Sequence, residues 1–310
     1  MATTRIISID GGGVRGVIPT IVLQRLRADP RLSGWLERTD LFAGTSTGGL
    51  IALALAAQLD LATIRALYEE RAARVFDDGW LDDVRDLGKI LGADYDAKNL
   101  EREVAEVFGD TRLDQLPRRV LITAFDLDNE KLPAERSWKP KLFHNYPGDG
   151  SDGAMLAAKV GAYTSAAPTY FGSIDGYVDG GVFATNPSMC ALTQTQDDRI
   201  PPDEQADLRE IRLLSLGTGR SLEYIEGAEH DWGYLQWVRP LISIMLDGVN
   251  GIADYQCAQI LGKRYFRFAP TFPAGTTIAM DDVDRLPELV EFAENLDLGP
   301  LVEWMADGWI

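Results

Sequence analysis

The chain has few histidines, few cysteines and a shortage of basic residues. Among its 310 residues are two histidines, two cysteines and 30 Lys and Arg against 48 Asp and Glu, which gives a formal net charge of −18. Cys190 and Cys257 lack the spacing of metal ligands, which argues against a structural zinc site. The negative charge repels nucleic acids and anionic lipid surfaces, so electrostatic attraction to either is excluded.

Long apolar runs are missing as well. The most apolar segment, residues 50–61, is shorter than the roughly 18 residues that a transmembrane helix needs and carries Gln58 and Asp60. The N-terminus passes directly into a strand pattern at Ile6, without the apolar core of a signal peptide. We therefore expect a cytoplasmic protein that contacts membranes at most peripherally.

Short apolar strands and helical patterns alternate along the chain. Strands are predicted at residues 5–9, 39–43, 119–125, 141–145, 177–179, 210–216 and 264–268. Helices are predicted at residues 17–26, 50–58, 61–68, 98–108, 154–164 and 241–261. This alternation predicts an α/β fold with a mostly parallel central sheet and helices on both faces. No repeat or linker divides the chain, so residues 1–310 are predicted to form one domain, with the acidic segment 77–96 as an excursion or lid.

A candidate nucleophile lies between a predicted strand and a buried helix. Gly44-Thr45-Ser46-Thr47-Gly48 fits the G-x-S-x-G pattern of a nucleophile elbow, and the residues 44–49 are predicted to form a tight turn. The serine of an elbow adopts a strained conformation, and glycines at the flanking positions avoid collisions with neighbouring strands. Ser46 is thus a candidate nucleophile supported by Gly44 and Gly48. The alternative is that Ser46 only caps the following helix.

A second glycine motif follows the first strand. Gly11, Gly13 and Gly16 match the G-x-G-x-x-G pattern of a dinucleotide-binding loop. However, Asp10 would lie against the pyrophosphate, and the acidic residue expected after a second strand is missing. If the first two strands are neighbours, the amides of Gly11 to Gly13 would instead stabilise an oxyanion beside Ser46. Arg15 is expected to form a structural salt bridge rather than to touch substrate.

A serine nucleophile needs a base, and the residues leave the choice open. His144 lies near the end of a predicted strand, and His230 lies in a polar, acidic stretch. Asp179 ends a short strand before Gly180 and Gly181, where a plain Asp-Gly turn is the simpler explanation.

Three motifs in this order resemble the patatin-like phospholipases, a family of lipid acyl hydrolases. They are Asp10-Gly11-Gly12-Gly13-Val14-Arg15-Gly16, Gly44-Thr45-Ser46-Thr47-Gly48-Gly49 and Asp179-Gly180-Gly181. The resemblance covers about residues 5–220, and residues 221–310 match only loosely. It implies a three-layer sandwich, with Ser46 as nucleophile, Asp179 as its base and the amides of Gly11, Gly12 and Gly13 as the oxyanion hole.

The resemblance also implies what the protein acts on. Ser46 would attack carboxylic esters of glycerolipids, with neither metal nor cofactor and no histidine. Contact with a membrane or micelle would be transient. From their apolar character, Trp80, Leu81, Tyr170 and Phe171 are candidate contacts at the mouth of the site, and the alternative is that they belong to the ordinary core. Two alternatives remain: a short-chain carboxylesterase and, in a different class, a nucleotide-binding module that uses residues 11–16.

Overall fold

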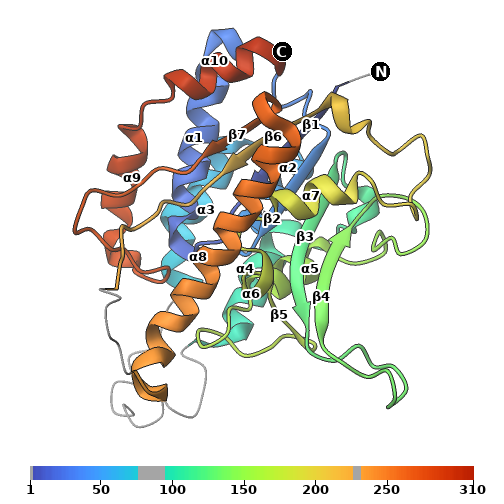
Figure 1. The fold of residues 1–310 in the computed structure, drawn as a ribbon, viewed down its shortest axis with the longest axis vertical. Helices are drawn as coiled ribbons and strands as arrows, with labels where there is room; N and C mark the ends of the chain where they lie inside the picture. Colours follow the sequence, from blue (N-terminus) through green and yellow to red (C-terminus); the bar gives the residue numbers. More distant parts are fainter. Residues whose placement is uncertain (1–2, 76–94, 226–231) are drawn as a thin grey trace.

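The strands form one mixed, mostly parallel sheet. The computed structural model describes residues 3–75, 95–225 and 232–310 (Figure 1). The sheet order is β4-β3-β2-β1-β6-β7, and β5 also pairs with β3. The strands are β1 (Thr4–Ile9), β2 (Leu41–Thr45), β3 (Arg119–Asp126), β4 (Lys139–His144), β5 (Tyr177–Asp179), β6 (Ile211–Leu216) and β7 (Tyr265–Phe268). β4 and β5 run antiparallel to β3, and the other pairings are parallel, as predicted.

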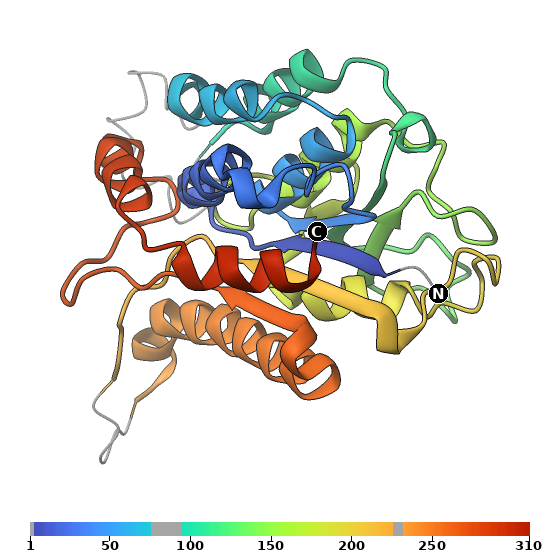
Figure 2. The ribbon, with the colours of Figure 1, turned by 90° about the horizontal axis from the view of Figure 1, so that it is seen from above.

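Helices cover both faces of this sheet, as the view from above shows (Figure 2). They are α1 (Val17–Ala28), α2 (Thr47–Ala56), α3 (Leu61–Val75), α4 (Ala97–Phe108), α5 (Ala157–Ser165), α6 (Gly181–Ala184), α7 (Ser188–Gln194), α8 (Tyr234–Leu261), α9 (Leu286–Glu294) and α10 (Gly299–Gly308). In the described part of the chain, none of these helices has the length and apolarity needed to span a bilayer.

Alternate residues of the strands pack into two cores. Ile7 and Ile9 of β1 pack with side chains of α1, α2, α5 and α10, whereas Ile6 packs with side chains of α7 and α8. All three isoleucines are fully buried. Because successive side chains of a strand point to opposite faces, this split requires a helical layer on each side. The predicted three-layer α/β architecture is therefore confirmed.

Several predicted boundaries shift. The prediction of a turn over residues 44–49 is wrong, because β2 continues to Thr45 and α2 begins at Thr47, so that Ser46 alone lies between them. Gly48 thus lies in the first helical turn, where its lack of a side chain is required by packing rather than by a turn. α9 and α10 were not predicted. The predicted excursion at 77–96 lies almost entirely outside the described residues.

The order of the strands determines where a site can form. β1 has β2 on one side and β6 on the other, so the chain leaves β1 at a point where the strand order reverses. In open α/β sheets, ligands bind outside the carboxyl ends of strands at such a point. The carboxyl ends of β1 and β2 lead directly into the glycine motif and into Ser46.

Candidate active site

Ser46 occupies a sharp strand-to-helix turn. Its φ of 55° and ψ of −127° lie in a region that non-glycine residues rarely adopt. Its amide donates a hydrogen bond to Oγ1 of Thr164 in α5, at 2.8 Å. Its side chain makes no capping hydrogen bond to α2, so the alternative that Ser46 is only a helix cap is wrong. The geometry is that of a nucleophile elbow.

The pairing register brings Asp179 to Ser46. Thr45 of β2 pairs with Thr123 of β3, and Asp179 of β5 pairs with the next residue, Ala124. β4 occupies the other edge of β3, so β2 and β5 follow one another along a single edge. Ser46 and Asp179 therefore meet where one strand gives way to the other, and the Ser46 side chain lowers the pKa of the Asp179 carboxyl group.

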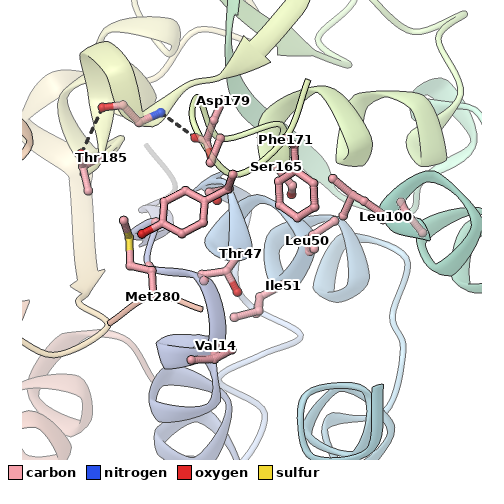
Figure 3. Close-up of a pocket in the computed structure, with 18 of the residues that line it drawn as sticks. Val14, Thr47, Leu50, Ile51, Leu100, Ser165, Phe171, Asp179, Thr185 and Met280 are labelled. Carbon is pink, nitrogen blue, oxygen red and sulfur yellow. Dashed lines mark hydrogen bonds between the residues drawn. The ribbon is translucent and has the colours of Figure 1, made fainter. Parts of the chain in front are cut away.

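Burial changes the proton affinity of Asp179. Its carboxyl group is buried, and this burial raises its pKa from 3.8 to about 6. The Ser46 side chain and the Gly181 amide, which donates to Oδ1 of Asp179 at 2.7 Å (dashed in Figure 3), lower this pKa and so act in the opposite direction. A carboxylate with this pKa is mostly ionised at neutral pH, yet it accepts a proton more readily than an exposed carboxylate.

The glycine loop lies against Ser46. A methyl group at Gly11 would approach Cβ of Ser46 to 3.4 Å. The Gly11 amide donates to the Thr185 carbonyl at 3.0 Å, and the Gly11 carbonyl accepts from Oγ1 of Thr218 at 2.7 Å. Within the described residues, the amides of Gly12 and Gly13 have no hydrogen-bond partner. Two of the three expected oxyanion donors are thus free, whereas the Gly11 amide is already occupied.

Close backbone approaches explain most of the motif glycines. Gly13 has a positive φ of 56°, and a Cβ there would lie 2.0 Å from the Met280 carbonyl oxygen. A Cβ at Gly48 would lie 2.2 Å from the carbonyl oxygen of Ile9, which joins the start of α2 to the end of β1. A Cβ would also collide with a neighbour at five further motif positions, namely Gly12, Gly16, Gly44, Gly49 and Gly180.

The charged residues of the glycine motif have structural partners. The carboxylate of Asp10 forms a buried, two-pronged ion pair with Arg267 of β7, whose guanidinium also contacts Ser215 and Asn250. The ion pair expected for Arg15 is absent from the described part of the chain, and its Nε instead donates to the Gly12 carbonyl at 3.4 Å. The sequence analysis did not identify Arg267 as the partner of Asp10. A cationic residue inside the otherwise apolar strand β7 indicates that a buried acidic partner is needed.

Ser46 and Asp179 line a largely apolar pocket. It has a volume of about 390 Å³ and extends between α2, α3 and α4 (Figure 3). Its wall is made largely of aliphatic and aromatic side chains, among them Leu50, Ile51, Ala54, Leu100, Val104 and Phe108. Gly11, Gly12 and Gly13 line the same pocket. A long, flexible apolar group is therefore the ligand that best matches the pocket.

The histidines take no part in this pocket as far as the structure describes it. His144 is buried on β4, and burial lowers its pKa. It pairs with Leu121, three residues before the Ala124 position that faces Asp179, and it does not line the pocket. His230 lies outside the described residues. Among the described residues, no group of three or more His, Cys, Asp or Glu side chains could hold a metal ion.

The chain is similar in sequence to a family model and to several known proteins. A family model described as patatin-like phospholipase matches residues 7–192. Patatin-2-Kuras 4 of Solanum tuberosum is 29% identical over 343 residues, covering 94% of this chain and 85% of its own. The cGAMP-activated phospholipase of Pseudomonas aeruginosa (strain BWHPSA011 / Pa011) is 29% identical over 273 residues, covering 86% and 78%. CotR of Bacillus subtilis (strain 168) is 28% identical over 340 residues, covering 100% and 99%.

The family model spans well over half of the chain and includes all three motifs that first suggested the resemblance. The chain therefore belongs to the patatin-like phospholipase family and is a lipid acyl hydrolase of the serine ester hydrolase class.

Proposed function

We propose that this protein cleaves carboxylic ester bonds of glycerolipids, as a phospholipase A or lysophospholipase, with Ser46 as nucleophile and Asp179 as general base. The observation that carries the proposal is the juxtaposition of Ser46 and Asp179 in the wall of a largely apolar pocket. The raised pKa of Asp179 suits a base that must take a proton from an alcohol near neutral pH.

The reaction would proceed in two halves. In the first, Asp179 takes the proton of the Ser46 hydroxyl while Oγ attacks the ester carbonyl carbon. The amides of Gly12 and Gly13 donate to the oxyanion of the tetrahedral intermediate. Protonated Asp179 then gives its proton to the departing alkoxide, which leaves an acyl group on Ser46. In the second half, Asp179 takes a proton from a water molecule while the water oxygen attacks the acyl carbonyl carbon. The bond between this carbon and Ser46 Oγ then breaks, and Asp179 returns the proton to Oγ, which releases the fatty acid and regenerates both Ser46 and the Asp179 carboxylate.

The shape of the pocket favours a long acyl chain over the alternatives. A short-chain carboxylesterase would leave the apolar wall between α2 and α4 unfilled. A dinucleotide would place its pyrophosphate beside the Asp179 carboxylate in a pocket lined mainly by apolar side chains, which is unfavourable for an anion. We therefore prefer a glycerolipid substrate to either of these alternatives.

We further propose a cytoplasmic location with transient contact to lipid aggregates. Both cysteines, Cys190 and Cys257, are free thiols, which is typical of proteins in a reducing compartment.

Chemical labelling tests the assignment of the nucleophile. The protein is incubated with a fluorophosphonate, digested and analysed by mass spectrometry. We expect the modification on Ser46, and weaker labelling in the Asp179→Asn variant because the base that activates Oγ is missing. Modification of a different serine, or saturable binding of a dinucleotide without labelling of Ser46, would refute the proposal.

A further inference from the structure

Exposed apolar side chains gather on the edge of the sheet where the pocket begins. β1, β2, β3 and β6 all end at this edge, because they run parallel to one another. The segment after β3 carries Leu132 and Trp138, whose exposed fractions are 79% and 73%. The segment after β6 carries Leu222 and Tyr224, exposed by 55% and 84%. Large apolar side chains at such exposure are unfavourable in water unless something covers them.

The N-terminal half of α8 adds to the same side of the molecule. Trp237, Ile244 and Met245 are exposed there, and Met245 also lines the pocket. Val182 of α6 is likewise both exposed and part of the pocket wall. Figure 1 shows the N-terminal end of α8 and the segment between β3 and β4 projecting on one side of the molecule. Val182 and Met245 thus connect the exposed surface with the wall of the pocket.

Charged side chains near Leu132 and Trp138 form ion pairs within the protein. In the segment between β3 and β4, Lys131 pairs with Glu135, and Arg136 pairs with Asp128. Leu132 and Trp138 therefore lie among charges that are already paired within the protein, which matches an electrically neutral surface. The net charge of −18 also disfavours an anionic one.

We propose that Leu132, Trp138, Leu222, Tyr224, Trp237 and Ile244 form a docking face that seats the pocket mouth on a zwitterionic lipid surface. The inference rests on the proposed function, since it explains how a lipid ester reaches Ser46. A lipid surface can occupy this face and still deliver an acyl chain into the pocket. A protein partner on the same face would cover the mouth and prevent substrate from entering.

The docking face differs from the contacts expected from the sequence. Phe171 is buried and Tyr170 is half-buried, and both line the pocket instead of projecting toward solvent. Trp80 and Leu81 lie outside the described residues.

The test compares matched variants on two kinds of substrate. Leu132→Gln with Trp138→Gln alters the segment between β3 and β4, and Ile244→Gln alters α8. Ile260→Gln is the control, because Ile260 lies on the same helix with an exposed fraction of 40% against 46% for Ile244, but near the opposite edge of the sheet. Binding to phosphatidylcholine vesicles is measured by flotation in a Ser46→Ala background. Rates are measured on the same vesicles and on a soluble, monomeric p-nitrophenyl ester.

We expect the double variant to weaken vesicle binding by about tenfold or more, because two large apolar side chains no longer leave water on docking. Ile244→Gln should weaken binding several-fold and Ile260→Gln should not. Rates on vesicles should fall in parallel, whereas rates on the soluble ester should stay unchanged in all three variants.

Two results would overturn the docking face. One is wild-type vesicle affinity in both the double variant and Ile244→Gln, which would point to a protein partner as the occupant. The other is an equal loss of affinity in Ile260→Gln. A failure of the proposed function is distinguishable, because wild-type protein would then bind vesicles but hydrolyse neither substrate.

Discussion

At the scale of single residues, Ser46 combines a strained backbone with a fixed amide and a carboxylate close to its hydroxyl. Its amide is bound by Thr164, and its hydroxyl faces Asp179. We expect Ser46→Ala to lower kcat by about 10³-fold or more without loss of folding, because alanine fits the turn but provides no nucleophile. The measurement is hydrolysis of a p-nitrophenyl ester, with thermal unfolding as the check on folding. Ser137→Ala, at an exposed serine away from the pocket, is the control and should behave as wild type.

Asp179 is predicted to link activity to pH. As a base it must be ionised, so the rate should rise as the pH increases through about 6, its pKa in the folded protein, and level off above that value. Asp179→Asn should lower kcat by about 10²- to 10⁴-fold at every pH and abolish this rise. A wild-type profile that stays flat between pH 5 and about 7 would rule out Asp179 as the base.

The same carboxylate should lower the stability of the protein. Its pKa is raised from 3.8 to about 6 on folding, so burying the ionised form costs about 3 kcal/mol above pH 6. This cost disappears below the unfolded pKa, where both states are protonated. We therefore expect Asp179→Asn to be more stable than wild type at pH 8 and equally stable near pH 3, as measured by urea unfolding. Lower stability of the variant at pH 8 would contradict this assignment.

Thr164 is a positioning residue that sequence reasoning missed. Its Oγ1 accepts the hydrogen bond of the Ser46 amide and holds the elbow without touching the reacting atoms. Thr164→Val keeps the shape but removes the acceptor, so we expect kcat to fall by about tenfold with little change in KM. Thr164→Ser should restore kcat. The control is Thr193→Val, because within the described residues the Thr193 hydroxyl bonds only to carbonyls of its own helix. A fall in kcat that serine does not rescue would indicate a packing defect instead.

At the scale of elements, α2 connects the nucleophile to the acyl pocket. The helix starts directly after Ser46, and at a rise of about 1.5 Å per residue Ala54 lies roughly 12 Å from Ser46 along the pocket wall. We expect Ala54→Phe to block the distal half of the pocket. Hydrolysis of a hexadecanoyl ester should then be lost, while hydrolysis of a butanoyl ester should continue. Equal loss on both esters would show that acyl chains do not follow α2.

The pairing of elements that are distant in the sequence could not be predicted. The strand and helix patterns and the three motifs could be predicted because they are local features of the sequence. That β1 and β2 are neighbours was not predicted but assumed, as the condition for placing the glycine amides beside Ser46. The pairing of β5 with the edge of β3 could not be predicted, because register depends on contacts between distant segments. The same holds for Thr164 and Thr185, which act on the site from other elements. α9 and α10 were missed although each has a proline in its first turn.

At the scale of the whole molecule, the net charge and the docking face act in opposite directions on an anionic membrane. The charge of −18 repels such a surface at long range, while the apolar tips bind it at short range. The Debye length falls from about 30 Å at 0.01 M salt to about 8 Å at physiological ionic strength, so added salt removes the repulsion but leaves the apolar contact intact.

We therefore expect the initial rate on anionic vesicles to rise with sodium chloride. On phosphatidylcholine vesicles at the same lipid concentration, the rate should be almost independent of salt, because only apolar contact drives docking there. The soluble ester serves as the control for direct effects of salt on catalysis. If the rate on anionic vesicles fell with salt instead, local basic residues would have to be attracting the lipid, and repulsion by the net charge would not govern the encounter.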